Sequence, residues 1–200
     1  MAKDTYKNFI ELTSHEKLNR DYKIWLSDVG SPITVMAPHG GRIEPRTSYI
    51  ARKIARDKFN CYCFEGIKAE NNGCLHLTSH NFDEPQALEL IARSQTVVTV
   101  HACTDKHCRV YLGGLNKKLI SAIAARLKAG GIVRARTNQK YPGLNPDNIC
   151  NRGTACKGAQ LEVSRGLRDD IKQVDLLAAA IHAALTDFIA CDRPFAAPKG

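Results

Sequence analysis

The chain has 200 residues, of which 44% are hydrophobic and 24% charged, and its formal net charge is +9. This balance excludes collagen-like, low-complexity and largely disordered chains. The length fits one domain over residues 1–200, and no apolar run approaches the roughly 20 residues of a membrane span. The first residues, MAKDTYKNFI, lack the apolar stretch of a signal peptide. We therefore expect synthesis in the cytoplasm, with cell lysis as the route to any action outside the cell.

Apolar runs rich in β-branched residues alternate with segments of helical period. This alternation predicts a single-domain α/β fold with an open, mixed, mostly parallel sheet flanked by helices. The predicted strands are 33–36, 61–65, 74–78, 96–100, 110–112, 132–135 and 160–164. The predicted helices are 47–57, 85–93, 117–128 and 175–190. Residues 138–158 are rich in Asn, Gly and Pro and are predicted to form a long loop that lines a site.

The positive charge is concentrated in one third of the chain. Residues 101–168 carry 13 basic and 3 acidic side chains. A field of that sign attracts polyanions such as nucleic acid, anionic polysaccharide or an acidic polypeptide. Charge alone does not choose among these partners, and a solvated basic face without a partner is the alternative interpretation.

Eight cysteines are present, but no C-x-x-C motif that would indicate a zinc ribbon or a thioredoxin-like redox site. Several of them lie in predicted strands, where free cysteine behaves as a small buried hydrophobe. We expect reduced, structural thiols, with Cys150 and Cys156 as a pair able to bridge on exposure to air.

Histidine and glutamate side chains follow two of the predicted strands. His39 and Glu44 lie in a glycine-containing turn after strand 33–36, and His101 follows strand 96–100. Open α/β sheets place their ligand crevices at the carboxyl ends of strands. Two imidazoles and a carboxylate, with a fourth position for water, are the ligand set of a catalytic zinc site. The alternative is structural, with His39 capping a turn and His101 bonded to backbone.

Glu162 places a carboxylate inside an apolar predicted strand. An unpaired buried carboxylate is costly, so a cation, a metal or a raised pKa must accompany it. Such a glutamate suits a general base acting on water at zinc. Asn151 and Arg152 lie near the end of the polar loop, where their N–H groups can donate paired hydrogen bonds to a carboxylate. Arg165 and Arg168 follow the strand, and together these groups favour an acidic substrate.

Four further side chains are weaker candidates. His80, in a polar turn, is predicted to line the site, and Tyr111 to donate a hydrogen bond to substrate; a structural role is the alternative for both. His76 has a weaker claim than His80. His182 lies on the apolar face of a predicted helix and is expected to be structural.

Eight short runs together resemble the phage and bacillar poly-γ-glutamate hydrolase family, over residues 21–168. They are APHGGRIEP, YCFEG, LHLTS, FDEP, VHAC, VYLGGL, ICNRG and QLEVSRGLR. The family is related to zinc carboxypeptidases, so the resemblance implies an open α/β core around one zinc ion per chain. It implies hydrolysis of the γ-glutamyl amide bonds of poly-γ-glutamate, an anionic capsule and biofilm polymer. His39, Glu44 and His101 are then the implied zinc ligands, and Glu162 the catalytic carboxylate.

The same resemblance assigns Asn151 and Arg152 to a substrate carboxylate. Four residues separate His39 from Glu44, whereas zinc carboxypeptidases have two between the corresponding ligands. The longer turn leaves the ligand chemistry unchanged, but exopeptidase specificity and an aromatic-pocket preference do not carry over.

Three alternatives remain open. A zinc amidohydrolase acting on a small N-acyl acidic amino acid would not shorten a polymer, so product size discriminates it. A nucleic-acid-binding module would interleave aromatic and basic side chains, yet residues 101–168 offer only Tyr111 and Tyr141. A metal-free structural protein would bind no zinc. We expect a monomer that acts on an anionic polymer, without nucleic-acid or membrane partners.

Overall fold

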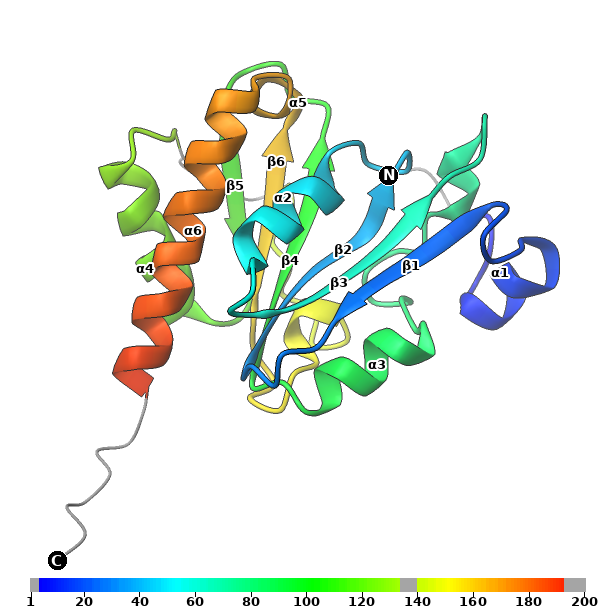
Figure 1. Ribbon diagram of the computed structural model, residues 1–200, viewed down its shortest axis with the longest axis horizontal. Coiled ribbons are helices and arrows are strands. Elements are labelled where there is room, and N and C mark those ends of the chain that lie inside the picture. The colour runs from blue at the N-terminus through cyan, green and yellow to red at the C-terminus, as the bar shows by residue number, and fades with distance from the viewer. Residues whose placement is uncertain (1–3, 134–139, 193–200) are drawn as a thin grey trace, which may run out of the picture.

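A six-stranded sheet forms the centre of the computed structural model, which describes residues 4–133 and 140–192 (Figure 1). The strands are β1 Tyr22–Ser27, β2 Ile33–Gly41, β3 Asn60–Gly66, β4 Thr96–Cys103, β5 Val110–Gly113 and β6 Ala159–Ser164. Their order across the sheet is β1-β3-β2-β4-β6-β5. The inner strands β3, β2, β4 and β6 run parallel, and the edge strands β1 and β5 pair antiparallel. The predicted open, mixed, mostly parallel sheet is confirmed.

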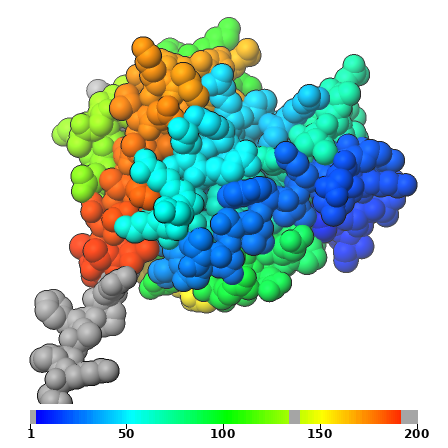
Figure 2. All heavy atoms as spheres, in the orientation of Figure 1, coloured from blue at the N-terminus to red at the C-terminus, as the bar shows by residue number. Residues whose placement is uncertain are grey.

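Helices cover both faces of this sheet (Figure 1). The α-helices are α1 Phe9–His15, α2 Thr47–Ala55, α3 Pro85–Ala92, α4 Lys117–Ala129, α5 Arg165–Arg168 and α6 Ile171–Asp192. One hydrophobic cluster joins α2, α4 and α6 to the sheet face that carries Val35 and Val100. The other joins α1 and α3 to the face that carries Met36 and Phe64. Figure 2 shows α2 and α6 side by side on the first of these faces.

Two helix starts follow the sequence directly. The Asn116 side chain accepts a hydrogen bond from the Leu119 N–H, as expected of an N-cap, and α4 follows. The Glu84 side chain caps α3 in the same way, with Pro85 in the first turn.

The last helix, α6, is longer than the helix predicted at 175–190. Among the described residues, α6 is the one helix long and apolar enough to cross a membrane, with a mean hydropathy of 1.7 over an 18-residue stretch within Ile171–Cys191. Its side chains Leu177, Ile181 and Leu185 are buried in the core beside α2 and α4.

The strand predicted at 74–78 is wrong. A 3-10 helix occupies Asn72–Leu75, and the following residues pair with no strand, although the apolar side chains are buried as the alternation suggested. In this segment the backbone bonds to side chains and not to a neighbouring strand. Nε2 of His39 donates to the Leu77 carbonyl, and the Thr78 N–H donates to Asp4. The strand predicted at 132–135 is absent at 132–133, and residues 134–135 lie outside the described residues.

The order of the strands fixes where a site can form. The chain runs from β2 to β3 on one side of β2, and then crosses to β4 on the other side. The crevice between the carboxyl ends of β2 and β4 is therefore a topological switch point, where open α/β sheets bind ligands. His39 lies in β2 and His101 in β4, so the two histidines flank this crevice.

Candidate active site

A tight turn after β2 brings Glu44 back to His39. The Glu44 N–H donates to the His39 carbonyl at 2.9 Å. Gly41 has a φ of +63°, a backbone conformation that favours glycine. A Cβ atom at Gly40 would collide with the Ser48 hydroxyl. The two glycines thus let the turn fold closely enough for the carboxylate to face the imidazole.

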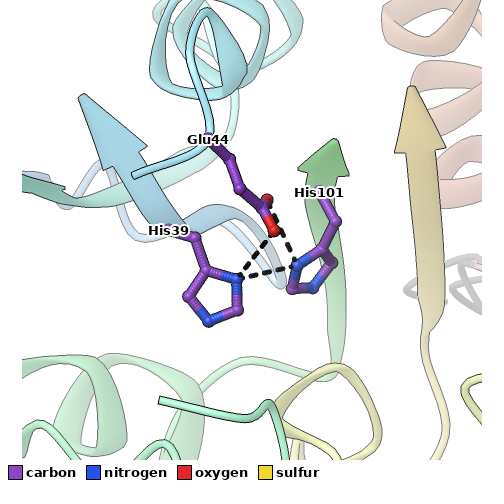
Figure 3. Close-up of side chains that lie close together, drawn as sticks. All are labelled: His39, Glu44 and His101. Carbon is purple, nitrogen blue, oxygen red and sulfur yellow. Dashed lines mark hydrogen bonds and ion pairs between the residues drawn. The ribbon is translucent and has the colours of Figure 1, made fainter. Parts of the chain in front are cut away.

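His39, Glu44 and His101 converge on one point between β2 and β4 (Figure 3). The two Nδ1 atoms lie 3.2 Å apart, Nδ1 of His39 lies 3.4 Å from Glu44 Oε1, and Nδ1 of His101 lies 3.7 Å from Glu44 Oε2. Atoms bound to one tetrahedral zinc at about 2.0 Å are separated from each other by about 3.3 Å. The two Nδ1 atoms and the carboxylate group therefore lie about as far apart as the ligands of one tetrahedral zinc ion.

The opposite ring nitrogens orient the two imidazoles. Nε2 of His39 lies 2.7 Å from the Leu77 carbonyl, and Nε2 of His101 lies 3.4 Å from the Ser79 hydroxyl. A carbonyl oxygen only accepts, so His39 carries its proton on Nε2 and turns the Nδ1 lone pair toward the cluster. Oxygen partners behind metal-binding histidines fix tautomer and orientation in this way.

The cluster's charges suit a divalent cation. Burial lowers the pKa of His39, which favours the neutral ring that binds metal. Burial disfavours the Glu44 carboxylate, but the two imidazoles outweigh it and hold its pKa well below the ordinary value. Glu44 also outweighs the burial of His101 and raises the pKa of that ring. An ionised carboxylate beside two imidazoles is the donor set that a divalent cation such as zinc binds, and these residues fit zinc.

Glu162 lies beside this cluster on the neighbouring strand. Its Cα is the register partner of His101 across the β4–β6 pairing, and the residue is 7% exposed. Burial raises the pKa of Glu162 to about 7, against the opposing charge of His101. A carboxyl that titrates near neutrality can accept and return a proton, which is the behaviour of a general base.

A cavity of about 610 Å³ connects these groups, and it is lined by His39, Glu44, His101, Glu162 and His80 among others. The structure therefore places His80 at the cavity wall, and its contact with substrate stays a prediction. Five residues that no sequence pattern indicated also line the cavity: Asp4, Ser79, Lys140, Asn148 and Gln160. Asp4 bonds to Nδ1 of His76 at 2.8 Å from 72 positions away, so no local sequence pattern could indicate it.

The structure does not bring the other predicted substrate contacts to the cavity wall. Among the described basic side chains of residues 101–168, Lys140 is the one that lines it. Arg165 is exposed and pairs with Asp169, and Arg152 donates to the Phe82 carbonyl. Tyr111 is the register partner of Glu162 on β5, but its hydroxyl donates to Asp105. Contact of Arg152, Arg165 and Tyr111 with substrate stays a prediction.

Arg168 is buried, and its side chain bonds to the backbone of three segments. Its guanidinium donates to the carbonyls of Val163, Pro45 and Cys103 at 3.2, 2.7 and 3.1 Å. These carbonyls belong to β6, to the turn after Glu44 and to the end of β4, so Arg168 joins three segments that carry the site. Its contact with substrate also stays a prediction.

Asn151 uses its whole side chain to hold the long loop. Its Oδ1 accepts from the N–H groups of Leu115 and Gly158, and its Nδ2 donates to the carbonyls of Gly143 and Asn145. An amide makes at most about four such bonds. Asn151 therefore has no donor left for a substrate carboxylate in this arrangement.

Replacing Asn151 by Ala is expected to destabilise the protein by about 3 kcal/mol, because several buried backbone groups lose their partners. Urea unfolding of the metal-free protein measures the effect. Arg152→Ala is the neighbouring control, since its exposed side chain has one bond and should cost less than about 1 kcal/mol. Equal losses of stability in the two variants would contradict a structural role for Asn151.

The raised pKa of Glu162 predicts how the stability of the metal-free protein depends on pH. Its folded pKa of about 7 lies above the ordinary glutamate pKa of 4.5, so this group stabilises the fold fully below about pH 4.5. That stability is lost as the pH rises through about 7. Glu162→Gln, which does not titrate, should therefore be more stable than wild type at about pH 8 by about 3 kcal/mol, and no more stable at about pH 4. Denaturant unfolding at the two pH values tests this; an equal difference at both would contradict it.

Comparisons with known proteins identify the family of this chain. The poly-gamma-glutamate hydrolase family model matches residues 6–188. Protein YndL of Bacillus subtilis (strain 168) is 34% identical over 172 residues, which cover 85% of this chain and 68% of YndL. Among solved structures, a bacteriophage poly-gamma-glutamate hydrolase matches with TM-score 0.90 and 27% identity, over 95% of this chain and all of the other. A zinc-free apo structure of YndL matches with TM-score 0.82 and 30% identity, over 94% and 98% of the two chains.

The family match covers the strands, the turn and the ligand cluster described above, so the resemblance seen in the sequence is confirmed. The chain belongs to the poly-gamma-glutamate hydrolase family.

Proposed function

We propose that this protein is a zinc-dependent hydrolase that cleaves the γ-glutamyl amide bonds of poly-γ-glutamate. Membership of a hydrolase family supports the reaction class. The observation that carries the zinc dependence is the convergence of His39, Glu44 and His101 at zinc-like spacing, with Glu162 beside them in the same cavity. One zinc ion per chain fits the one such cluster found among the described residues.

Different side chains of the protein carry out metal binding and proton transfer in this reaction. His39, Glu44 and His101 would hold zinc, which supplies a Lewis acid that activates water and polarises the scissile carbonyl. Glu162 accepts the proton of the attacking water at its carboxylate and delivers it to the nitrogen of the leaving amine. The raised pKa of Glu162 lets the same carboxyl act first as base and then as acid near neutral pH.

The cavity also offers groups for the carboxylates of the polymer. Lys140 carries a positive charge at the cavity wall, 5.3 Å from the centre of the Tyr141 ring, and the exposed His80 lines the same cavity. Each glutamyl unit of the polymer carries a free carboxylate, so we propose that Lys140 and His80 pair with these groups.

Incubation of the zinc-loaded protein with poly-γ-glutamate tests the proposal, with product size followed by gel filtration and viscosity. We expect rapid shortening of the polymer, loss of activity with a chelator and recovery when zinc is added. A parallel incubation with N-acyl glutamate tests the small-substrate alternative. Cleavage of that compound with an unshortened polymer, or no hydrolysis of either by folded, zinc-loaded protein, would refute the proposed substrate.

A further inference from the structure

Two buried amide side chains form a hydrogen-bonded chain that ends on Glu162. Nδ2 of Asn148 donates to Oε1 of Gln160 at 2.9 Å, and Nε2 of Gln160 donates to Oε1 of Glu162 at 3.1 Å. All three residues are more than nine-tenths buried, and all three line the cavity. These hydrogen-bonded amides therefore lie inside the site, next to the carboxylate that the proposed reaction uses.

The direction of this chain is fixed at its far end. Asn148 is the N-cap of the 3-10 helix Ile149–Asn151, and its Oδ1 accepts from the Cys150 N–H at 3.1 Å. That bond turns the Asn148 NH₂ group toward Gln160, which must then offer its oxygen to Asn148 and its NH₂ group to Glu162. Reversing either amide would set donor against donor or oxygen against oxygen, at the cost of unsatisfied buried groups.

The strand β6 holds the two partners together. Side chains of a strand alternate between its faces, so Gln160 and Glu162 share the cavity side. Leu161 and Val163 lie in the hydrophobic core on the other side. Packing of these core residues fixes the strand, and the backbone therefore sets the distance between the amide and the carboxylate.

We propose that Gln160 is a positioning residue for Glu162, and that Asn148 acts through Gln160 by fixing the orientation of its amide. The hydrogen bond from Gln160 holds Oε1 of Glu162 in place and leaves Oε2 to take the proton of the attacking water. This role rests on the proposed function for its kinetic consequence, while the hydrogen-bonded chain itself can be tested without substrate.

Two variants break the chain at different points. Gln160→Met keeps the side-chain length and removes the donor to Glu162. Asn148→Asp keeps the acceptor for the Cys150 N–H but loses the donor, so the Gln160 amide should turn to face the new carboxylate. We expect each variant to lower kcat about tenfold, with KM within about twofold of wild type and one zinc ion per chain retained. The double variant should lose no more activity than Gln160→Met, because the effect of Asn148 passes through Gln160.

Asn145→Asp is the matched control for the added negative charge. Asn145 lines the same cavity outside the amide chain, and its Oδ1 accepts from a backbone N–H as that of Asn148 does. The loss in Asn148→Asp should exceed the loss in Asn145→Asp. Unchanged kcat in Gln160→Met, additive losses in the double variant, or a loss explained by missing zinc would each overturn the proposal.

Nuclear magnetic resonance of the metal-free protein gives a readout that needs no substrate. The side-chain amide protons of Gln160, assigned by their loss in Gln160→Met, should shift in Glu162→Ala and in Asn148→Asp but not in Asn145→Asp. Signals that stay unmoved in the first two variants would overturn the amide chain. Zinc-loaded wild type without hydrolytic activity would refute the proposed function, and the amide signals would still decide the chain.

Discussion

Hydrolysis of poly-γ-glutamate by Glu162→Gln is expected to fall by about 1,000-fold, with one zinc ion per chain still bound. The amide keeps the shape of the side chain and an oxygen able to accept the bond from Gln160. It cannot take a proton from water near neutral pH, so the proposed acid–base steps both fail. Zinc is retained because Glu162 lies outside the His39, Glu44 and His101 ligand cluster. Initial rates and metal analysis of the purified variant measure the two effects.

Glu89→Gln makes the same chemical change at an exposed position on α3. Among the residues that the structure describes, its carboxylate pairs with Arg93, the C-cap of α3, and it does not line the cavity, so both activity and zinc content should match wild type. Zinc-loaded Glu162→Gln with substantial turnover would remove Glu162 from the reaction. Loss of zinc from that variant would instead make Glu162 part of the metal centre.

The strands that carry the site could be predicted because their signals are local. Strands β2 and β4 are buried on both faces and read as mainly apolar runs, so His39 and His101 stand out against them. Strand β6 alternates polar and apolar residues, and Glu162 stands out as its one charged side chain. The carboxyl ends of parallel strands meet at one sheet edge, so the position of each histidine in sequence already indicated that the two would meet.

Other features depend on contacts between distant parts of the chain. The segment 74–78 alternates like a strand, but His39 and Asp4 take up backbone groups at Leu77 and Thr78. β1 was not predicted because it is a half-exposed edge strand without a continuous apolar run. Neither arrangement has a signal in the nearby sequence.

Polar side chains were the least predictable part of the site. Asn151 and Arg168 have the chemistry of carboxylate-binding groups, but here they bind backbone and hold the loops in place. No sequence pattern marks Gln160 as a site residue, yet its side chain donates a hydrogen bond to Glu162. Residue type indicates what a side chain is able to bind, and only the fold shows which partner is within reach.

Loss of a metal ligand is expected to remove both activity and the stabilising effect of zinc. In wild type, zinc at about 1,000 times its Kd should stabilise the fold by about 4 kcal/mol, which raises the Tm of a chain of this size by about 10 °C. His101→Ala leaves two of the three ligands, so zinc at the same concentration should shift its Tm little and hydrolysis should fall to background. Thermal unfolding with and without zinc, together with polymer sizing, measures both effects.

His182→Ala is the control for removal of a histidine. His182 lies on α6, where Nδ1 is 2.8 Å from the Ile54 carbonyl, and it does not line the cavity. This variant should lose some stability but keep the full zinc-dependent rise in Tm and wild-type hydrolysis. A rise in Tm that survives in His101→Ala would place zinc elsewhere on the protein. Hydrolysis that survives both chelation and His101→Ala would show that the reaction does not need this metal centre, because each treatment removes it by an independent route.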